Sequence, residues 1–172
     1  MNKILVIGSP GSGKSTLSKE LSKILNIPIL HLDYIFHIDN YHHINKDEFL
    51  LKIKQFVSEN DRFIIDGNYR DTLDFRLKFA DTIILFNIPT NICLENILKR
   101  IKSNEPRDDI AKGFDNSTYD QEFIDYVKTF KDKEYPIILE KLNNFTNIII
   151  KIQSYKGKEN FINELKIYKH KE

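Results

Sequence analysis

The chain has 172 residues, of which 41% are hydrophobic and 30% charged, a composition typical of a globular protein with one core. Its formal net charge is +1, from 26 basic and 25 acidic residues, so no overall field favours nucleic acid or anionic lipid. A single cysteine, Cys93, excludes an intramolecular disulfide. No apolar run is long enough for a membrane span or a signal peptide, and we expect a cytoplasmic protein with one domain over residues 1–172.

Five short apolar runs alternate with amphipathic stretches. The runs are typical of strands buried on both faces and lie at residues 4–7, 28–32, 62–65, 82–86 and 147–152. Helices are predicted at residues 15–25, 46–58, 90–102 and about 158–168, with two more within 120–142, interrupted near Pro136. This alternation predicts an α/β fold with a parallel sheet, helices on both faces and ligands at the carboxyl ends of the strands.

The most specific motif directly follows the first predicted strand. It matches the phosphate-binding loop (Walker A) pattern G-x-x-x-x-G-K-[ST], in which backbone N–H groups and a helix N-terminus surround phosphate oxygens. In this chemistry Lys14 contacts the β- and γ-phosphates, and the Ser15 hydroxyl ligates Mg²⁺. We therefore expect a nucleoside triphosphate site for ATP and Mg²⁺, although the loop does not distinguish ATP from GTP. The predicted binding residues are Gly8, Ser9, Pro10, Gly11, Ser12, Gly13, Lys14, Ser15 and Thr16.

Two carboxylates follow predicted strands at the same edge of the sheet. Asp66 ends an apolar run and precedes Gly67, a position suited to holding Mg²⁺; the alternative is a turn-forming Asp-Gly pair. Asp33 follows another run and is a candidate to share the metal, accept a proton from an acceptor hydroxyl or bind the acceptor; the alternative is a helix N-cap. Spacing does not decide which carboxylate lies closer to the metal.

A polar, turn-rich stretch at about residues 103–118 separates two predicted helices and has the character of a small lid. Arg107 lies within it, and Lys99, Arg100 and Lys102 lie just before it. Arginines on a closing segment neutralise the charge of a transferring phosphoryl group, so we assign catalytic roles to Arg100 and Arg107. A basic helix end that offsets the helix dipole is the alternative for the residues before the lid.

Four histidines fall within thirteen residues: His31, His37, His42 and His43. A metal cluster is one interpretation, but the spacing matches no zinc pattern. The favoured interpretation is that they line an acceptor pocket or cover the edge of the core, together with nearby aromatic residues.

These motifs together resemble the P-loop nucleotide-kinase-like proteins of the bacterial "topology modulation" (adenylate-kinase-related) family. The resemblance covers nearly the whole chain and depends most on residues 8–16, 31–33 and 65–69. It implies a three-layer P-loop NTPase sandwich with a five-stranded parallel sheet in the order 2-3-1-4-5. It also implies that Asp66 helps to organise Mg²⁺, that lid arginines close on the phosphates, and that residues 68–76 face the phosphoryl acceptor. Asn96 stands where family members usually have an arginine that covers the base.

The resulting hypothesis is a Mg²⁺-dependent phosphotransferase that moves the γ-phosphoryl of ATP to a small acceptor, with Lys14, Asp33, Arg100 and Arg107 as catalytic residues. The acceptor is a nucleotide, a nucleoside or another metabolite. The alternative is a regulatory nucleotide-binding protein or ATPase without such an acceptor. A DNA-associated factor is a weaker alternative, because the chain lacks a basic excess. We expect no membrane partner, and a monomer or a homodimer.

Overall fold

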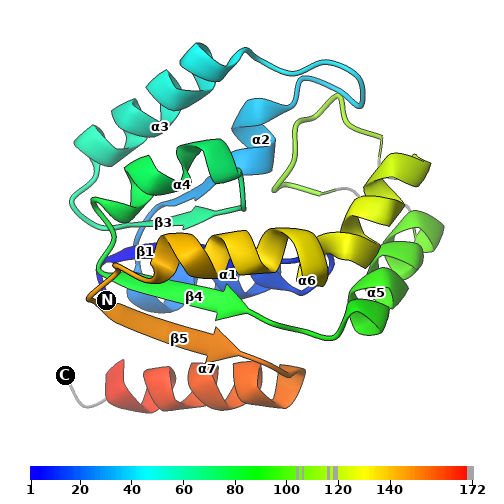
Figure 1. Cartoon of the computed structure of the whole chain (residues 1–172). Helices are drawn as coiled ribbons and strands as arrows, with labels where there is room; N and C mark the ends of the chain where they lie inside the picture. Colours follow the sequence, from blue (N-terminus) through cyan, green and yellow to red (C-terminus); the bar gives the residue numbers. More distant parts are fainter. Residues whose placement is uncertain (104, 106, 116, 118–119, 170–172) are drawn as a thin grey trace.

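The fold is built on one five-stranded parallel sheet, seen in the computed structural model of the chain (Figure 1). The structure describes residues 1–103, 105, 107–115, 117 and 120–169. The strands are β1 (Lys3–Gly8), β2 (Ile29–His31), β3 (Phe63–Asp66), β4 (Thr82–Phe86) and β5 (Ile148–Ile152). They are arranged in the order β2-β3-β1-β4-β5, and every pairing is parallel. The predicted α/β class and strand order are confirmed.

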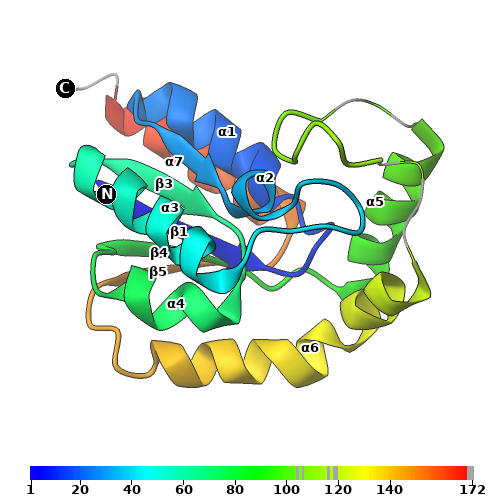
Figure 2. The same ribbon diagram turned by 90° about the horizontal axis from the view of Figure 1, so that it is seen from above.

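Helices cover both faces of this sheet, as the view from above shows (Figure 2). The helices are α1 (Lys14–Leu25), α2 (Leu32–Phe36), α3 (Lys46–Glu59), α4 (Arg70–Leu77), α5 (Thr90–Ser103), α6 (Gln121–Leu142) and α7 (Tyr155–Lys169). Alternate side chains of β1 point to opposite faces of the sheet and pack in different clusters. Ile4 and Val6 pack in the cluster that includes α1 and α7, while Leu5 and Ile7 pack in the cluster that includes α3, α4 and α6. All four are fully buried, so β1 is the centre of a three-layer structure.

The prediction of two helices within residues 120–142 is wrong, because α6 is a single helix with Pro136 inside it. A proline in a helix removes one backbone hydrogen bond and costs about 3 kcal/mol. Apolar side chains on both sides of Pro136 are buried against the sheet, including Phe130 and Ile138. Packing of this stripe offsets the local cost, and the helix continues.

The second predicted strand is also shorter than expected, because the chain turns into α2 at Leu32. Asp33 therefore lies in the first turn of a short helix whose N-cap is His31, and the N-cap alternative for Asp33 is wrong. The outer strands depart from the expected two-sided burial. Ile148 begins β5, the last strand in the sheet order, and is 54% exposed.

Among the described residues, no helix combines the length and the apolar character that crossing a bilayer requires.

Candidate active site

The phosphate-binding loop joins β1 to α1 in the predicted strand–turn–helix arrangement. Gly11 has φ +76°, and a Cβ there would lie 2.3 Å from the carbonyl oxygen of Cys93, so both its backbone angle and its surroundings require glycine. Gly13, with φ +92°, is the last residue before α1. The ammonium group of Lys14 donates to the carbonyl oxygen of Ser9 at 2.9 Å, which folds its side chain back over the loop.

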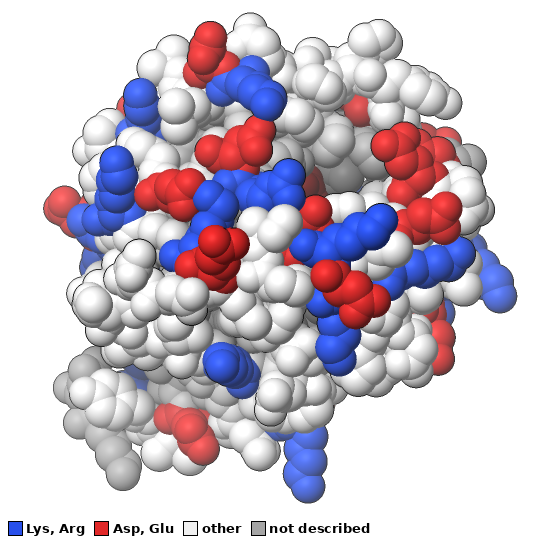
Figure 3. All heavy atoms as spheres, viewed as in Figure 1, with Lys and Arg blue, Asp and Glu red and all other residues white. Residues whose placement is uncertain are grey.

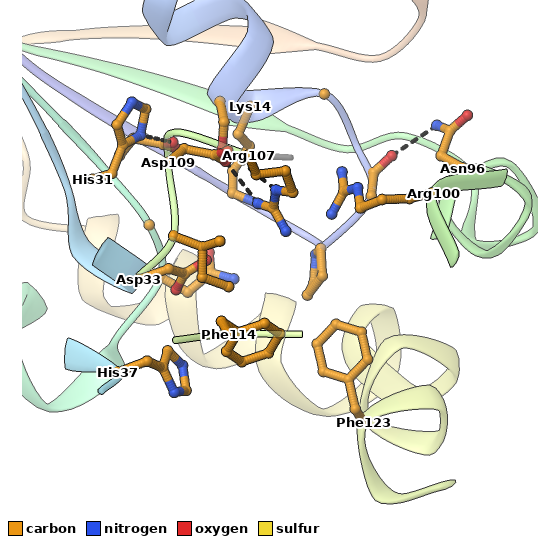
Figure 4. A pocket seen from close by; sticks show the side chains of 18 of the residues that line it. Lys14, His31, Asp33, His37, Asn96, Arg100, Arg107, Asp109, Phe114 and Phe123 are labelled. Atoms are coloured by element: carbon orange, nitrogen blue, oxygen red, sulfur yellow. Dashed lines mark hydrogen bonds and ion pairs between the residues drawn. The ribbon is translucent and has the colours of Figure 1, made fainter. Parts of the chain in front are cut away.

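A cavity of about 900 Å³ opens beside this loop, large enough for two small ligands. Six of the predicted loop residues line it: Pro10, Gly11, Gly13, Lys14, Ser15 and Thr16. Ser9 and Ser12 are buried instead. Figure 4 shows Lys14, Arg100 and Arg107 on one side of the cavity and Asp33 on the other. The phosphate-binding loop and Asp33, both predicted from the sequence to belong to the site, therefore line the same cavity.

Asp66 is the last residue of β3 and is 4% exposed. Its Oδ2 accepts a hydrogen bond from Nδ1 of His31 at 2.9 Å, across the β2–β3 register that pairs these two residues. Within the described part of the chain its Oδ1 is buried and has no hydrogen-bond partner. A buried carboxylate oxygen of this kind, in a cavity shared with the Ser15 hydroxyl, fits the oxygen ligands that Mg²⁺ prefers.

The charge of Lys14 is set by opposing effects. Burial lowers the pKa of Lys14 below its usual value, and the carboxylates of Asp66 and Asp33 act in the opposite direction. A partly desolvated ammonium group interacts with phosphate oxygens more strongly than one in water.

Asp33 is held by the hydroxyl of Tyr69, which donates to its Oδ1 at 2.8 Å. Burial, together with the nearby charge of Asp33, raises the pKa of Tyr69 well above its usual range. Tyr69 therefore stays protonated and acts as a donor, and Asp33 keeps its second oxygen for another partner.

Of residues 68–76, which the family resemblance places towards the acceptor, only 68–70 line the cavity. Arg76 is buried behind this segment, which joins β3 to α4, and holds it in place. Its side chain is 1% exposed and donates to the carbonyl oxygens of Gly67 at 3.1 Å and Tyr69 at 3.0 Å, and also to that of Asn68. Tyr69 has φ +38°, an uncommon angle for a residue with a side chain. The guanidinium group thus holds this segment in a conformation that it would otherwise rarely adopt.

The lid contributes an ion pair to the same cavity. Nε and Nη2 of Arg107 lie 3.1 Å and 2.7 Å from the two carboxylate oxygens of Asp109, which is 4% exposed. Burial raises the pKa of Asp109, but hydrogen bonds from Arg107 and the Ser15 hydroxyl outweigh it, and the pKa lies well below the usual value. Lys19 of α1 lies 3.5 Å from the same carboxylate. Asp109 therefore joins the lid to the phosphate-binding loop. Residues 104, 106, 116 and 118 of the expected lid lie outside the described residues.

At the other side of the loop, the basic residues of α5 differ in whether they line the cavity. Lys99 and Arg100 line the cavity, whereas Lys102 is exposed. Asn96 donates to the carbonyl oxygen of Gly11 at 2.8 Å and also contacts the hydroxyl of Tyr155. The residue that replaces the expected base-covering arginine therefore joins the loop to α5 and α7.

The four clustered histidines do not form one group, although His37 and His43 pair in an isolated bridge and pack on the same phenylalanine ring. His31 bonds to Asp66 and His37 lines the cavity, whereas His42 pairs with Asp39 at 2.8 Å and the ring of His43 stacks on a phenylalanine. In the described part of the chain, no group of three or more His, Cys, Asp or Glu side chains is arranged to hold a metal ion. The interpretation as a pocket and core edge describes their positions better than a metal cluster.

Several cavity residues were missed because they come from α6, far along the chain. Phe123, Tyr126, Glu134 and Ile138 line the cavity at helical spacing. The sequence shows the helical periodicity of these residues, but it does not show against which face of the sheet the helix packs.

Comparison with known proteins agrees with this geometry. No family model matches the chain. A shikimate kinase of Clostridium botulinum is 26% identical over 91% of this chain and 97% of its own length. The ATP-dependent kinase YFH7 of Candida glabrata is 40% identical over 58 residues, which are 30% of this chain but only 16% of that protein.

Two solved structures share the fold. Shikimate kinase from Bacteroides thetaiotaomicron has a TM-score of 0.58 at 17% identity, over 96% of each chain. A gluconokinase from Sinorhizobium meliloti also has a TM-score of 0.58, at 11% identity, over 99% of this chain and 92% of its own. The chain therefore shares the fold of these two solved kinases.

Proposed function

We propose that this protein is a small-molecule kinase that transfers the γ-phosphoryl group of ATP to a hydroxyl or phosphate of an acceptor. The observation that carries the proposal is the shared cavity, which extends from the phosphate-binding loop to the Asp33–Tyr69 pair. A protein that only binds or hydrolyses a nucleotide has no need for this second compartment. The names of the relatives, shikimate kinase and gluconokinase, support the same class.

In this proposal, Lys14 and the loop amides hold the phosphates of the donor. Arg100 and Arg107 neutralise charge on the transferring group, and Asp33 orients the acceptor hydroxyl or takes its proton. Closure of the lid excludes water, which otherwise competes as the acceptor.

Ser15 and Asp66 are the residues proposed to hold Mg²⁺, because the free Oδ1 of Asp66 is buried in the same cavity. Mg²⁺ held by these residues would offset the negative charge of the phosphates. His31 keeps the Asp66 side chain in place through its hydrogen bond to Oδ2.

Four further points stay predictions. They are a single domain of residues 1–172 with a lid at about 103–118, the narrower resemblance to topology-modulation proteins, a cytoplasmic location, and a monomeric or homodimeric state. A nucleic-acid role has less support. On the face in Figure 3, basic and acidic side chains are interspersed and no basic patch forms.

The test is a screen of the purified protein with ATP, Mg²⁺ and a library of nucleosides, nucleotides, sugars and small metabolites. Mass spectrometry should detect a phosphorylated acceptor with the wild-type protein and none with Lys14→Ala. Release of inorganic phosphate without any phosphorylated acceptor would favour the regulatory ATPase instead.

A further inference from the structure

At the acceptor end of the cavity, the described lining residues include more acidic than basic side chains. This end is formed by α2 with His37, by residues 68–69 with the start of α4, and by α6 with its N-cap Asp120. Among the described lining residues of these elements, Asp33, Asp120 and Glu134 are carboxylates, and Arg70 is the one Lys or Arg. An anionic acceptor would meet more negative than positive charge there.

The guanidinium group of Arg70 is already neutralised. Its Nη1 lies 3.4 Å and 3.5 Å from the two carboxylate oxygens of Glu134. Glu134 is the more enclosed partner, with 24% of its side chain exposed against 46% for Arg70. A carboxylate or phosphate on the acceptor would share this guanidinium with Glu134 and would lie close to its negative charge.

Among the described lining residues of these elements there is no other Lys or Arg, and the Lys14 ammonium acts on Asp33 from the phosphate-binding loop. Burial lowers the pKa of His37, so its imidazole is neutral near pH 7. Burial, followed by the charge of Glu134, raises the pKa of Tyr126 to about 12, so its hydroxyl stays protonated. Arg76 lies behind the segment and donates to backbone carbonyls, and it does not line the cavity.

Aromatic rings form the walls between these charges. The ring of Phe114 meets His37 edge to face at a centroid distance of 5.4 Å, and Phe123 lines the α6 side (Figure 4). Tyr126 of α6 also lines the cavity. Aromatic faces bind planar rings, the C–H faces of sugars and cations. They offer no compensation for an anion.

We propose that the acceptor is a hydroxyl-bearing ring compound that is uncharged or cationic, such as a nucleoside, a sugar or an amino sugar, and carries no carboxylate or phosphate. This inference rests on the proposed kinase function and narrows it. Asp33 and the Tyr69 hydroxyl receive the reacting hydroxyl, the aromatic walls hold the ring, and Glu134 disfavours an anionic substituent.

The experiment compares acceptors in matched pairs that differ in charge. The pairs are a nucleoside and its monophosphate, glucose and gluconate, and methyl shikimate and shikimate, with glucosamine as the cationic member. Phosphate transfer from ATP is followed by mass spectrometry, and kcat/KM is measured for each acceptor that reacts. We expect the uncharged or cationic member to be preferred by about tenfold or more, the effect of one uncompensated charge at short range.

The variant Glu134→Gln frees Arg70 and should raise the relative kcat/KM of anionic acceptors by about tenfold. The matched control is Glu48→Gln on α3, an exposed carboxylate that does not line the cavity, and it should leave the ratio unchanged. Preferred transfer to the anionic members, or an unchanged ratio in Glu134→Gln, overturns the inference and leaves the kinase function standing. Absence of transfer to every member, with ATP hydrolysis intact, contradicts both.

Discussion

The backbone N–H of Gly8 donates a hydrogen bond to the side-chain oxygen of Asn68, at 3.0 Å. Gly8 ends β1 and opens the phosphate-binding loop, whereas Asn68 precedes α4 on the acceptor side. In the proposed kinase, this bond positions the acceptor segment relative to the phosphates of the donor. In a reaction that depends on alignment, this link affects rate more than stability.

Replacing Asn68 tests this link. We expect Asn68→Ala to lower the kcat of phosphoryl transfer roughly tenfold, because the two segments lose their shared register. The free energy of unfolding should fall by only about 1 kcal/mol, the net contribution of one hydrogen bond. Transfer assays and urea unfolding measure the two effects. The control Asn163→Ala, exposed on α7, should change neither. Equal activity in both variants would contradict the alignment role.

Arg76 gives a prediction about stability. Arg76→Met leaves the backbone carbonyls of Gly67, Asn68 and Tyr69 without their donor, and we expect the free energy of unfolding to fall by about 3 kcal/mol. Urea unfolding followed by circular dichroism measures the loss. Arg62→Met, at an exposed position with one side-chain hydrogen bond, should have little effect. Similar losses in the two variants would show that the buried guanidinium contributes nothing special.

The Asp109 carboxylate predicts a pH dependence. Its pKa in the folded protein lies below the usual value of about 3.9, so the unfolded chain binds more protons at acid pH. The stabilisation is complete above about pH 5 and is lost as the pH falls through the usual value towards the folded one. In melting experiments, Asp109→Asn should be less stable than wild type at pH 7, and the gap should close on acidification. A gap of constant size would argue against the ionised pair with Arg107. Asp61→Asn, at an exposed position before β3, is the control.

Nucleotide binding gives a prediction that needs no acceptor. At a concentration of about 100 Kd, ATP should raise the melting temperature of the wild-type protein by roughly 5 °C, in line with about 2.7 kcal/mol of binding linkage. Lys14→Ala should abolish the shift, since the ammonium group proposed to bind the phosphates is lost. Lys23→Ala, exposed on the same helix, should retain it. An undiminished shift in Lys14→Ala would overturn the assignment of the nucleotide site.

The contrast between the loop and the rest of the site shows what the sequence could predict. The phosphate-binding loop could be predicted because its glycines, Lys14 and Ser15 lie close together in sequence. The fold class could be predicted from the alternation of strands and helices. The strand order came from the family resemblance. The pair of His31 with Asp66 depends instead on the register between β2 and β3, which no local pattern states.

Longer-range packing decided the remaining features. Helix α6 passes through Pro136 because its apolar stripe is buried on both sides of that residue. This continuity brings Glu134 to Arg70, 64 residues away in sequence, and creates the acceptor end of the cavity. The family resemblance placed Arg76 in the acceptor-facing region but did not predict its contacts, because its partners are backbone carbonyls, which leave no signature in side-chain patterns.

The most direct test of the central claim follows the γ-phosphoryl group of labelled ATP in the presence of an acceptor that the protein uses. The wild-type protein should transfer most of the label to the acceptor. Asp33→Asn should reduce that transfer by about a hundredfold, the usual contribution of a positioned acid–base group, with ATP binding retained. If the label appears only as inorganic phosphate, at equal rates in both proteins, the protein is an ATPase and the kinase account is wrong.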